Sequence, residues 1–139
     1  MKNWMTKALT SGGLLLCLGA MPGCFVVADD DNDAPAPIGT LEVLWTIDGA
    51  TDPIDCADFA ADRMELLIYD GGRLVDEFEP FCEDFGISVD MFDGVYDGAA
   101  TLVDSFDDAV TTTEELEAID IIEGTTLTID VDFPLNSFR

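Results

Sequence analysis

Residues 126–133 read TLTIDVDF, the stretch of the chain in which the period of the fold is clearest. Apolar Leu127, Ile129, Val131 and Phe133 alternate there with threonine and aspartate. A period of two sends successive side chains to opposite faces of a strand, so that one face can be buried while the other meets water. The stretch therefore predicts a half-buried β-strand rather than a helix.

The same period of two recurs upstream, from Leu41 onward. Turn sequences such as DGG at residues 70–72 and DG at residues 93–94 separate the alternating segments. We expect seven strands, of which the sixth is the least regular, at residues 41–48, 63–69, 73–81, 87–91, 96–102, 109–121 and 126–133.

Two short stretches have helical features. Cys56, Phe59 and Ala60 fall at helical spacing behind Asp55, a candidate N-cap, so we expect one short helical turn within residues 55–62. Residues 113–118 read TEELEA and contain strong helix formers. Because six residues are too few for a helix to hold alone, we expect strand or loop there.

Seven short, half-buried strands in about 100 residues indicate an all-β fold, an antiparallel two-sheet sandwich. Trp45 could serve as a platform on which a sugar stacks, as in carbohydrate-binding modules. Its phase with Val43 and Ile47 instead predicts a place in the core.

Three apolar residues lie on the face opposite the core residues of their strands: Leu44, Leu67 and Tyr69. If the first two strands pair antiparallel with Trp45 opposite Leu66, these outward residues form one cluster. Such a cluster is either a partner-binding patch or the ordinary apolar exposure of a folded surface.

Residues 93–96, DGVY, open an alternating strand that runs to Asp104. This pattern resembles the G-x-Y strand start of immunoglobulin-like and transthyretin-like (carboxypeptidase regulatory-like) domains. The chain as a whole resembles uncharacterised bacterial lipoproteins of the myxobacteria type, a resemblance that implies a sandwich domain and an envelope location but no known activity. The Trp and Cys spacing of true immunoglobulin domains is not matched, because Trp45 precedes both Cys56 and Cys82.

Residues 1–23 combine a basic start, which ends at Lys7, with a short leucine-rich run. The run is too short to span a bilayer core of about 30 Å, so we expect a signal peptide. Gly23 before Cys24 resembles the cleavage box of bacterial lipoproteins, in which the cysteine becomes the lipidated first residue. The alternative is ordinary cleavage after Ala28, which would give a secreted or periplasmic protein.

Residues 24–39 are acidic and proline-containing, with almost no apolar content between residue 29 and Ile38. A segment of this composition cannot bury enough surface to offset its chain entropy, so we expect a disordered tether between the lipid and the domain. The sandwich is expected at residues 40–135, with a tail at residues 136–139. In lipoproteins of enteric bacteria, an aspartate directly after the lipidated cysteine retains the protein in the inner membrane. Here that position is Phe25, which favours the outer membrane.

Cys56 and Cys82 are the pair left once Cys17 and Cys24 are assigned to the signal peptide and the lipid. In an exported chain, such a pair is most simply a disulfide. A metal site is the alternative, but the chain has no C-x-x-C spacing and no histidine to complete a tetrahedral zinc site.

Charge excludes several classes of function. Cleavage before Cys24 leaves three arginines against 30 acidic residues, a net charge of 3 − 30 = −27. A polyanion of this density does not bind nucleic acid, which needs clustered Lys and Arg. With no His and no Lys after residue 23, Ser88, Ser105 and Ser137 have no base to activate them.

Calcium is the one cofactor that the sequence suggests. Asp104, Asp107 and Asp108 lie in one expected turn and could supply oxygen ligands, although Asp is also a common turn former. We expect no other cofactor. The overall prediction is a lipid-anchored cell-envelope protein without catalysis, with a structural or protein-binding role and another envelope protein as partner. The alternatives are a calcium- or carbohydrate-binding module and, behind that, a small hydrolase that uses two carboxylates.

Overall fold

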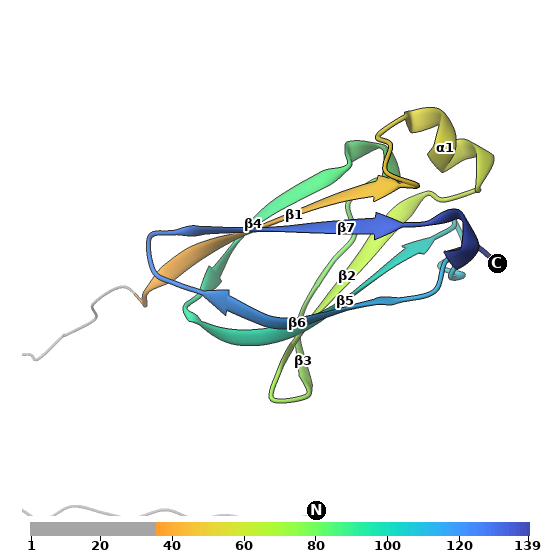
Figure 1. The fold of residues 1–139 in the computed structure, drawn as a ribbon. Helices are drawn as coiled ribbons and strands as arrows, with labels where there is room; N and C mark the ends of the chain where they lie inside the picture. The colour runs from red at the N-terminus through yellow and green to blue at the C-terminus, as the bar shows by residue number, and fades with distance from the viewer. Residues whose placement is uncertain (1–35) are drawn as a thin grey trace, which may run out of the picture. The chain divides into compact units, whose positions relative to one another are not determined.

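Seven strands and one short helix make up the part of the chain that the structure, a computed structural model, describes: residues 36–139 (Figure 1). The predicted signal peptide, Cys24 and most of the predicted tether lie outside the described residues. The elements are β1 (Ile38–Ile47), α1 (Pro53–Asp58), β2 (Arg63–Asp70), β3 (Arg73–Phe78), β4 (Gly86–Phe92), β5 (Gly94–Val103), β6 (Glu114–Ile121) and β7 (Thr126–Phe133). Two single 3-10 turns add to these, η1 (Cys82–Asp84) and η2 (Leu135–Ser137).

The strands form two sheets, as the alternating sequence predicts. One sheet has the order β4-β1-β7 and the other has the order β3-β2-β5-β6. All strand pairs are antiparallel except β1 with β7, which run parallel. The prediction of a wholly antiparallel sandwich was therefore wrong for this pair. Parallel pairing keeps the two alternating patterns in phase, with Trp45 beside Val131 and Ile47 beside Phe133.

The pairing on which the outward cluster of Leu44, Leu67 and Tyr69 depended, with Trp45 opposite Leu66, does not occur. β1 pairs with β4 and β7, whereas β2 pairs with β3 and β5. Residues 48–62, which include α1, connect β1 to β2. This connection is longer than a hairpin turn and leads the chain from one sheet to the other.

The core lies between the sheets and consists of the inward residues of both. The prediction that Trp45 belongs to this core is confirmed, because its side chain is almost fully buried. Its indole Nε1 donates a hydrogen bond of 3.0 Å to the backbone carbonyl oxygen of Cys82. The largest fully buried side chains also include Leu41, Ile47, Met64, Leu66, Ile68, Leu102, Ile119 and Phe133.

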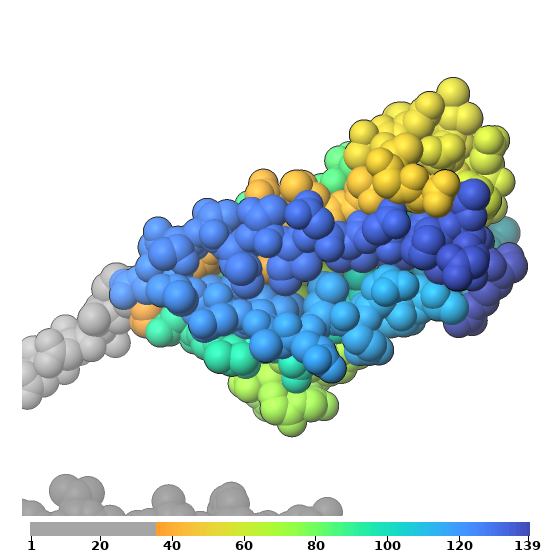
Figure 2. Space-filling model, viewed as in Figure 1, coloured from red at the N-terminus to blue at the C-terminus, as the bar shows by residue number. Residues whose placement is uncertain are grey.

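One side of the sandwich is closed more tightly than the other. Strands β6 and β7, which are edge strands of different sheets, contact each other and run together along the face shown in blue in Figure 2. The edge strands on the other side, β3 and β4, are not among the strand pairs in close contact. The sandwich therefore has one open side, between β3 and β4.

The helix α1 begins earlier than predicted, at Pro53 instead of within residues 55–62. Asp52, rather than Asp55, is its N-cap, and the Asp52 side chain accepts a hydrogen bond of 3.0 Å from the amide of Ile54. Proline suits the first helical position because its fixed φ is helical and the missing N–H would have had no partner within the helix.

Residues 109–121 contain a shorter strand than predicted. β6 begins at Glu114, which confirms strand rather than helix at most of residues 113–118. Residues 110–112 pair instead with the end of the chain: Thr112 N donates to the carbonyl of Ser137 at 2.8 Å, and Arg139 N donates to that of Val110 at 3.0 Å. Residues 136–139, predicted as a tail, thus lie within the hydrogen-bonded fold.

Thr111 is fully buried, and its hydroxyl oxygen accepts a hydrogen bond of 3.0 Å from the amide of Leu102. Thr111→Val keeps the shape but leaves this buried N–H without its acceptor, so we expect a loss of about 1–3 kcal/mol of unfolding free energy in urea titrations of the full chain. The matched control is Thr112→Val at the exposed neighbouring position, which should change stability by less than about 0.5 kcal/mol. Equal effects of the two substitutions would contradict the assignment.

Candidate functional site

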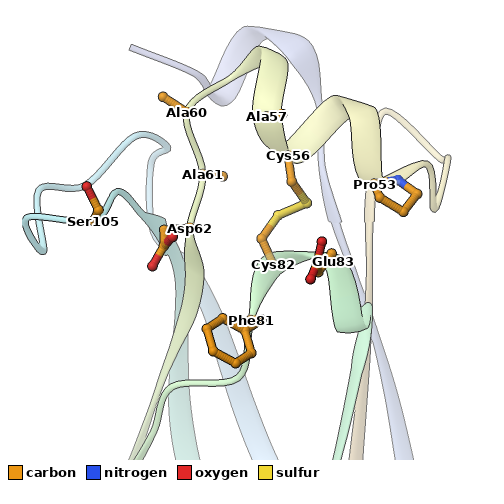
Figure 3. Close-up of a pocket in the computed structure, with 10 residues that line it drawn as sticks. All are labelled: Pro53, Cys56, Ala57, Ala60, Ala61, Asp62, Phe81, Cys82, Glu83 and Ser105. Carbon is orange, nitrogen blue, oxygen red and sulfur yellow. A yellow bond between two sulfur atoms is a disulfide. The ribbon is translucent and has the colours of Figure 1, made fainter.

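A cavity of about 520 Å³ lies at the α1 end of the sandwich (Figure 3). Its walls come from three parts of the chain that are distant in sequence: α1 with the residues after it, the segment before β4, and the loop after β5. The apolar lining consists of Pro53, Ala57, Ala60, Ala61, Phe81 and the Cys56–Cys82 pair, and the polar lining consists of Asp62, Glu83 and Ser105.

A disulfide joins Cys56 on α1 to Cys82 on η1, which confirms the predicted pairing. The Cα atoms lie 6.0 Å apart, within the range that disulfides require. The chain-entropy model gives about 3–3.5 kcal/mol for a loop closed across 26 residues. Since Trp45 also binds the carbonyl of Cys82, this wall of the cavity is attached both to the core and to α1.

The polar residues of the cavity are two carboxylates and one serine. The described residues contain no His and no Lys, so no such base accompanies Ser105. Asp62 lies 3.3 Å from the Arg63 guanidinium nitrogen Nε and is therefore engaged in an ion pair. The arrangement offers an apolar surface with carboxylates at its rim, which suits the burial of an apolar group more than bond cleavage.

Arg63 lies among three carboxylates near this end of the domain. Besides Asp62, it pairs with Glu79 at 3.3 Å and with Asp107. These are the only ion pairs within residues 36–139. Nearby, on β2, partial burial raises the pKa of Glu65 above its ordinary value, and the charges of neighbouring carboxylates, Glu77 first, raise it further. Negative charge is thus in excess even beside the arginine.

The loop of the candidate calcium ligands does not gather its carboxylates around one point. Asp104 Oδ1 accepts hydrogen bonds from the amides of Phe106 at 2.8 Å and Asp108 at 3.0 Å, the pattern of an Asx turn. Asp107 turns instead to Arg63. Within residues 36–139, no group of three or more His, Cys, Asp or Glu side chains is arranged to hold a metal ion.

The predicted partner patch does not form. Leu44 lies on β1 in one sheet, whereas Leu67 and Tyr69 lie on β2 in the other, and all three alternate with inward core residues. They therefore belong to opposite outer faces of the sandwich. The prediction was wrong because it rested on direct pairing of the first two strands, which the α1 connection prevents.

Three exposed apolar residues lie at the α1-end cavity or next in sequence to its lining. Phe81, which lines it, is 60% exposed, and Phe106 is 82% exposed. Phe106 and Ile54 each follow directly a residue that lines the cavity. None of the three was singled out from the sequence: Phe81 fell at the end of the strand expected at residues 73–81, whereas β3 ends at Phe78, and Ile54 and Phe106 fell outside the expected strands. For Ile54 and Phe106, the only available signal was the presence of large apolar side chains in expected turns, where polar residues are usual.

Comparisons with known proteins add little to this description. No protein-family model matches the sequence, and no curated protein matches it. Among solved structures, the chain is similar to part of a leucine-rich repeat protein from Bacteroides thetaiotaomicron VPI-5482, with 11% identity and a TM-score of 0.46. That match covers 70% of this chain and only 12% of the other.

In residues 36–139, no helix has the length and apolar character needed to cross a bilayer.

Proposed function

We propose that the protein is a lipid-anchored component of a bacterial cell envelope whose β-sandwich domain binds a protein partner at its α1 end and catalyses no reaction. The observation that carries the proposal is the 520 Å³ cavity with the exposed Phe81 at its rim. Its size falls within the range of about 300–1,000 Å³ that is usual for binding sites. Exposed apolar groups around a concave site mark an interaction surface.

The chemistry of the rim favours a partner with an apolar side chain flanked by basic residues. Asp62 and Glu83 line the cavity. Asp107 lies close to Asp62, because both carboxylates pair with Arg63. Like-charged surfaces repel, whereas a positively charged patch would be steered toward this end of the domain. An aromatic residue such as Phe81 is a typical centre of such an interface.

The position of the cavity agrees with an anchor on the N-terminal side. β1 is ten residues long, about 33 Å at the usual rise, and it runs from Ile38 to the residues that lead into α1. The chain therefore enters the sandwich at the end opposite α1 (Figure 1). A tether from Cys24 to Ile38 would leave the α1 end free to meet a partner, with the outer membrane as the proposed location.

Strand order favours the transthyretin-like form of the sandwich over the immunoglobulin-like one. Immunoglobulin constant domains place their first two strands in the same sheet. Here β1 and β2 lie in different sheets, and β1 pairs with the last strand, β7.

Lipidation at Cys24 is the first test of this proposal. Mass spectrometry of the protein extracted from membranes should find an N-terminal Cys24 that carries a diacylglyceryl group, because Gly23 and Cys24 follow the leucine-rich run. Cys24→Ala should move the protein out of the membrane fraction. A native N-terminus at Asp29 in the soluble fraction would contradict the anchor.

Partner binding at the α1 end is tested by photo-crosslinking in cells. We expect p-benzoylphenylalanine at position 81 to give a discrete adduct, because the Phe81 side chain is exposed at the rim. The matched control is the same group at Val95, which is 63% exposed on β5. Position 95 should give no such adduct.

A cavity-filling variant makes this test specific. Ala57 lines the cavity from α1, so Ala57→Trp should occupy the space and lower the yield of the position-81 adduct about tenfold, as expected for a central interface contact. An adduct that forms equally at both positions, or that is unaffected by Ala57→Trp, would reject a binding site in this cavity.

A further inference from the structure

A second cavity, of about 320 Å³, lies on the open side of the sandwich, between the edge strands β3 and β4. It is close to the point where the chain enters β1 and is therefore distant from α1. One part of its lining is apolar and includes two aromatic rings, and the other part carries three carboxylates. The apolar part is formed by Ile38, Val75, Met91, Phe92 and Tyr96, and the acidic part by Asp70, Asp76 and Asp90.

The irregular register of β3 explains how Asp76 reaches this cavity. The register between β2 and β3 shifts by one residue between Ile68 and Tyr69: Tyr69 pairs with Leu74, but Ile68 pairs with Asp76. Val75 is therefore left without a partner on β2. Asp76 consequently lies opposite Ile68, whose side chain is fully buried. Residues directly opposite each other point to the same face of a sheet, so the exposed Asp76 side chain lies on the side of the edge strand that borders the cavity.

The aromatic wall is fixed by the protein itself. Tyr96 donates a hydrogen bond of 3.1 Å from its hydroxyl to the carbonyl oxygen of Phe92, which links the start of β5 to the end of β4. The Phe92 side chain is largely exposed, and Met91 beside it is buried. A ligand in the cavity would therefore meet an apolar surface that is already formed.

The carboxylates lack a protein cation. All ion pairs within the described residues involve Arg63, which belongs to the α1 end. Asp90 accepts a hydrogen bond of 2.9 Å from the Thr40 hydroxyl on the outward face of β1 and β4. Arg73, opposite Asp70 in the hairpin, is exposed and makes no ion pair in residues 36–139. Burial raises the pKa of the Tyr96 phenol above its ordinary value, and the charges of Asp70, Asp93 and Asp76 raise it further.

We propose that this cavity binds an organic cation, an alkylammonium group whose carbon atoms contact Phe92, Tyr96 and Met91 while its charge faces Asp70 and Asp76. Two observations favour an organic cation over a metal ion. No carboxylate set in the described residues is arranged to hold a metal. The lining also combines aromatic residues with negative charge, the combination by which proteins recognise alkylated ammonium groups.

The competing explanation concerns the strand edge alone. An inward charge on an edge strand discourages pairing with other chains, and Asp76 would serve that purpose without any ligand. The two explanations differ in what a small cation should do. A binding site saturates and responds at the cavity, whereas an edge charge shows only diffuse, salt-like screening.

Methionine methyl NMR of the full chain separates them. With methyl-¹³C methionine, Met91 reports from the cavity, and Met64, buried on β2 and outside the cavity lining, is an internal control. Tetramethylammonium chloride is the probe, and sodium chloride at equal ionic strength is the reference. We expect a saturable shift of Met91 with tetramethylammonium only, while Met64 stays unchanged.

Two variants on β3 sharpen the result. Asp76→Asn should weaken tetramethylammonium binding about fivefold, the effect of removing one partly exposed charge partner. Glu77→Gln is the matched control, because Glu77 lies opposite the outward Leu67 and does not line the cavity. It should leave the dissociation constant within about twofold. An unshifted Met64 confirms that each variant is folded.

Three outcomes would overturn the proposal. The first is a Met91 response that does not saturate or that sodium chloride reproduces. The second is an equal response of Met64 and Met91. The third is equal weakening by Asp76→Asn and Glu77→Gln, because that would mean general charge rather than a site.

Discussion

Cys82 is the point on which the α1 end of this protein depends. Its side chain is bonded to Cys56 on α1, and its carbonyl oxygen accepts the indole hydrogen bond of Trp45 in the centre of the core. Because β1 lies between β4 and β7, the strand that carries Trp45 has a hydrogen-bonded neighbour on each side. A six-residue helix is too short to be stable alone. The disulfide therefore gives α1, and the cavity beside it, a fixed place on the sandwich.

The rest of the domain divides apolar burial from charge. The core is supplied by the alternating inward positions of both sheets, while most of the acidic residues occupy turns and outward positions, where water solvates them. This division leaves two places in which apolar surface and carboxylates meet. One is the α1-end cavity, and the other is the open side between β3 and β4. Both proposals concern these places, and both imply ligands that bring positive charge.

Much of the fold could be predicted because its information is local. The period of two located seven strands and placed Trp45 in the core, and the assignment of Cys17 and Cys24 to the signal peptide and the lipid left Cys56 and Cys82 as the pair to be bonded. Which strands pair could not be predicted in the same way, because pairing joins segments that are distant in sequence. The parallel partnership of β1 with β7 joins the two ends of the domain, and nothing in the alternation of β1 distinguishes that partner from β2. The misplaced patch at Leu44 and Leu67 followed from this, and Phe81 was missed because the strand expected at residues 73–81 includes it, whereas β3 ends at Phe78.

Detection of the bond between Cys56 and Cys82 tests most directly whether the disulfide holds α1 on the sandwich. The full chain should be denatured without reductant, treated with iodoacetamide, digested, and analysed by mass spectrometry. The account predicts that Cys56 and Cys82 escape alkylation, that their peptides remain linked, and that both react once a reductant is added. Alkylation of both residues without reductant would contradict it, because α1 would then have no covalent cross-link to Cys82 and the core.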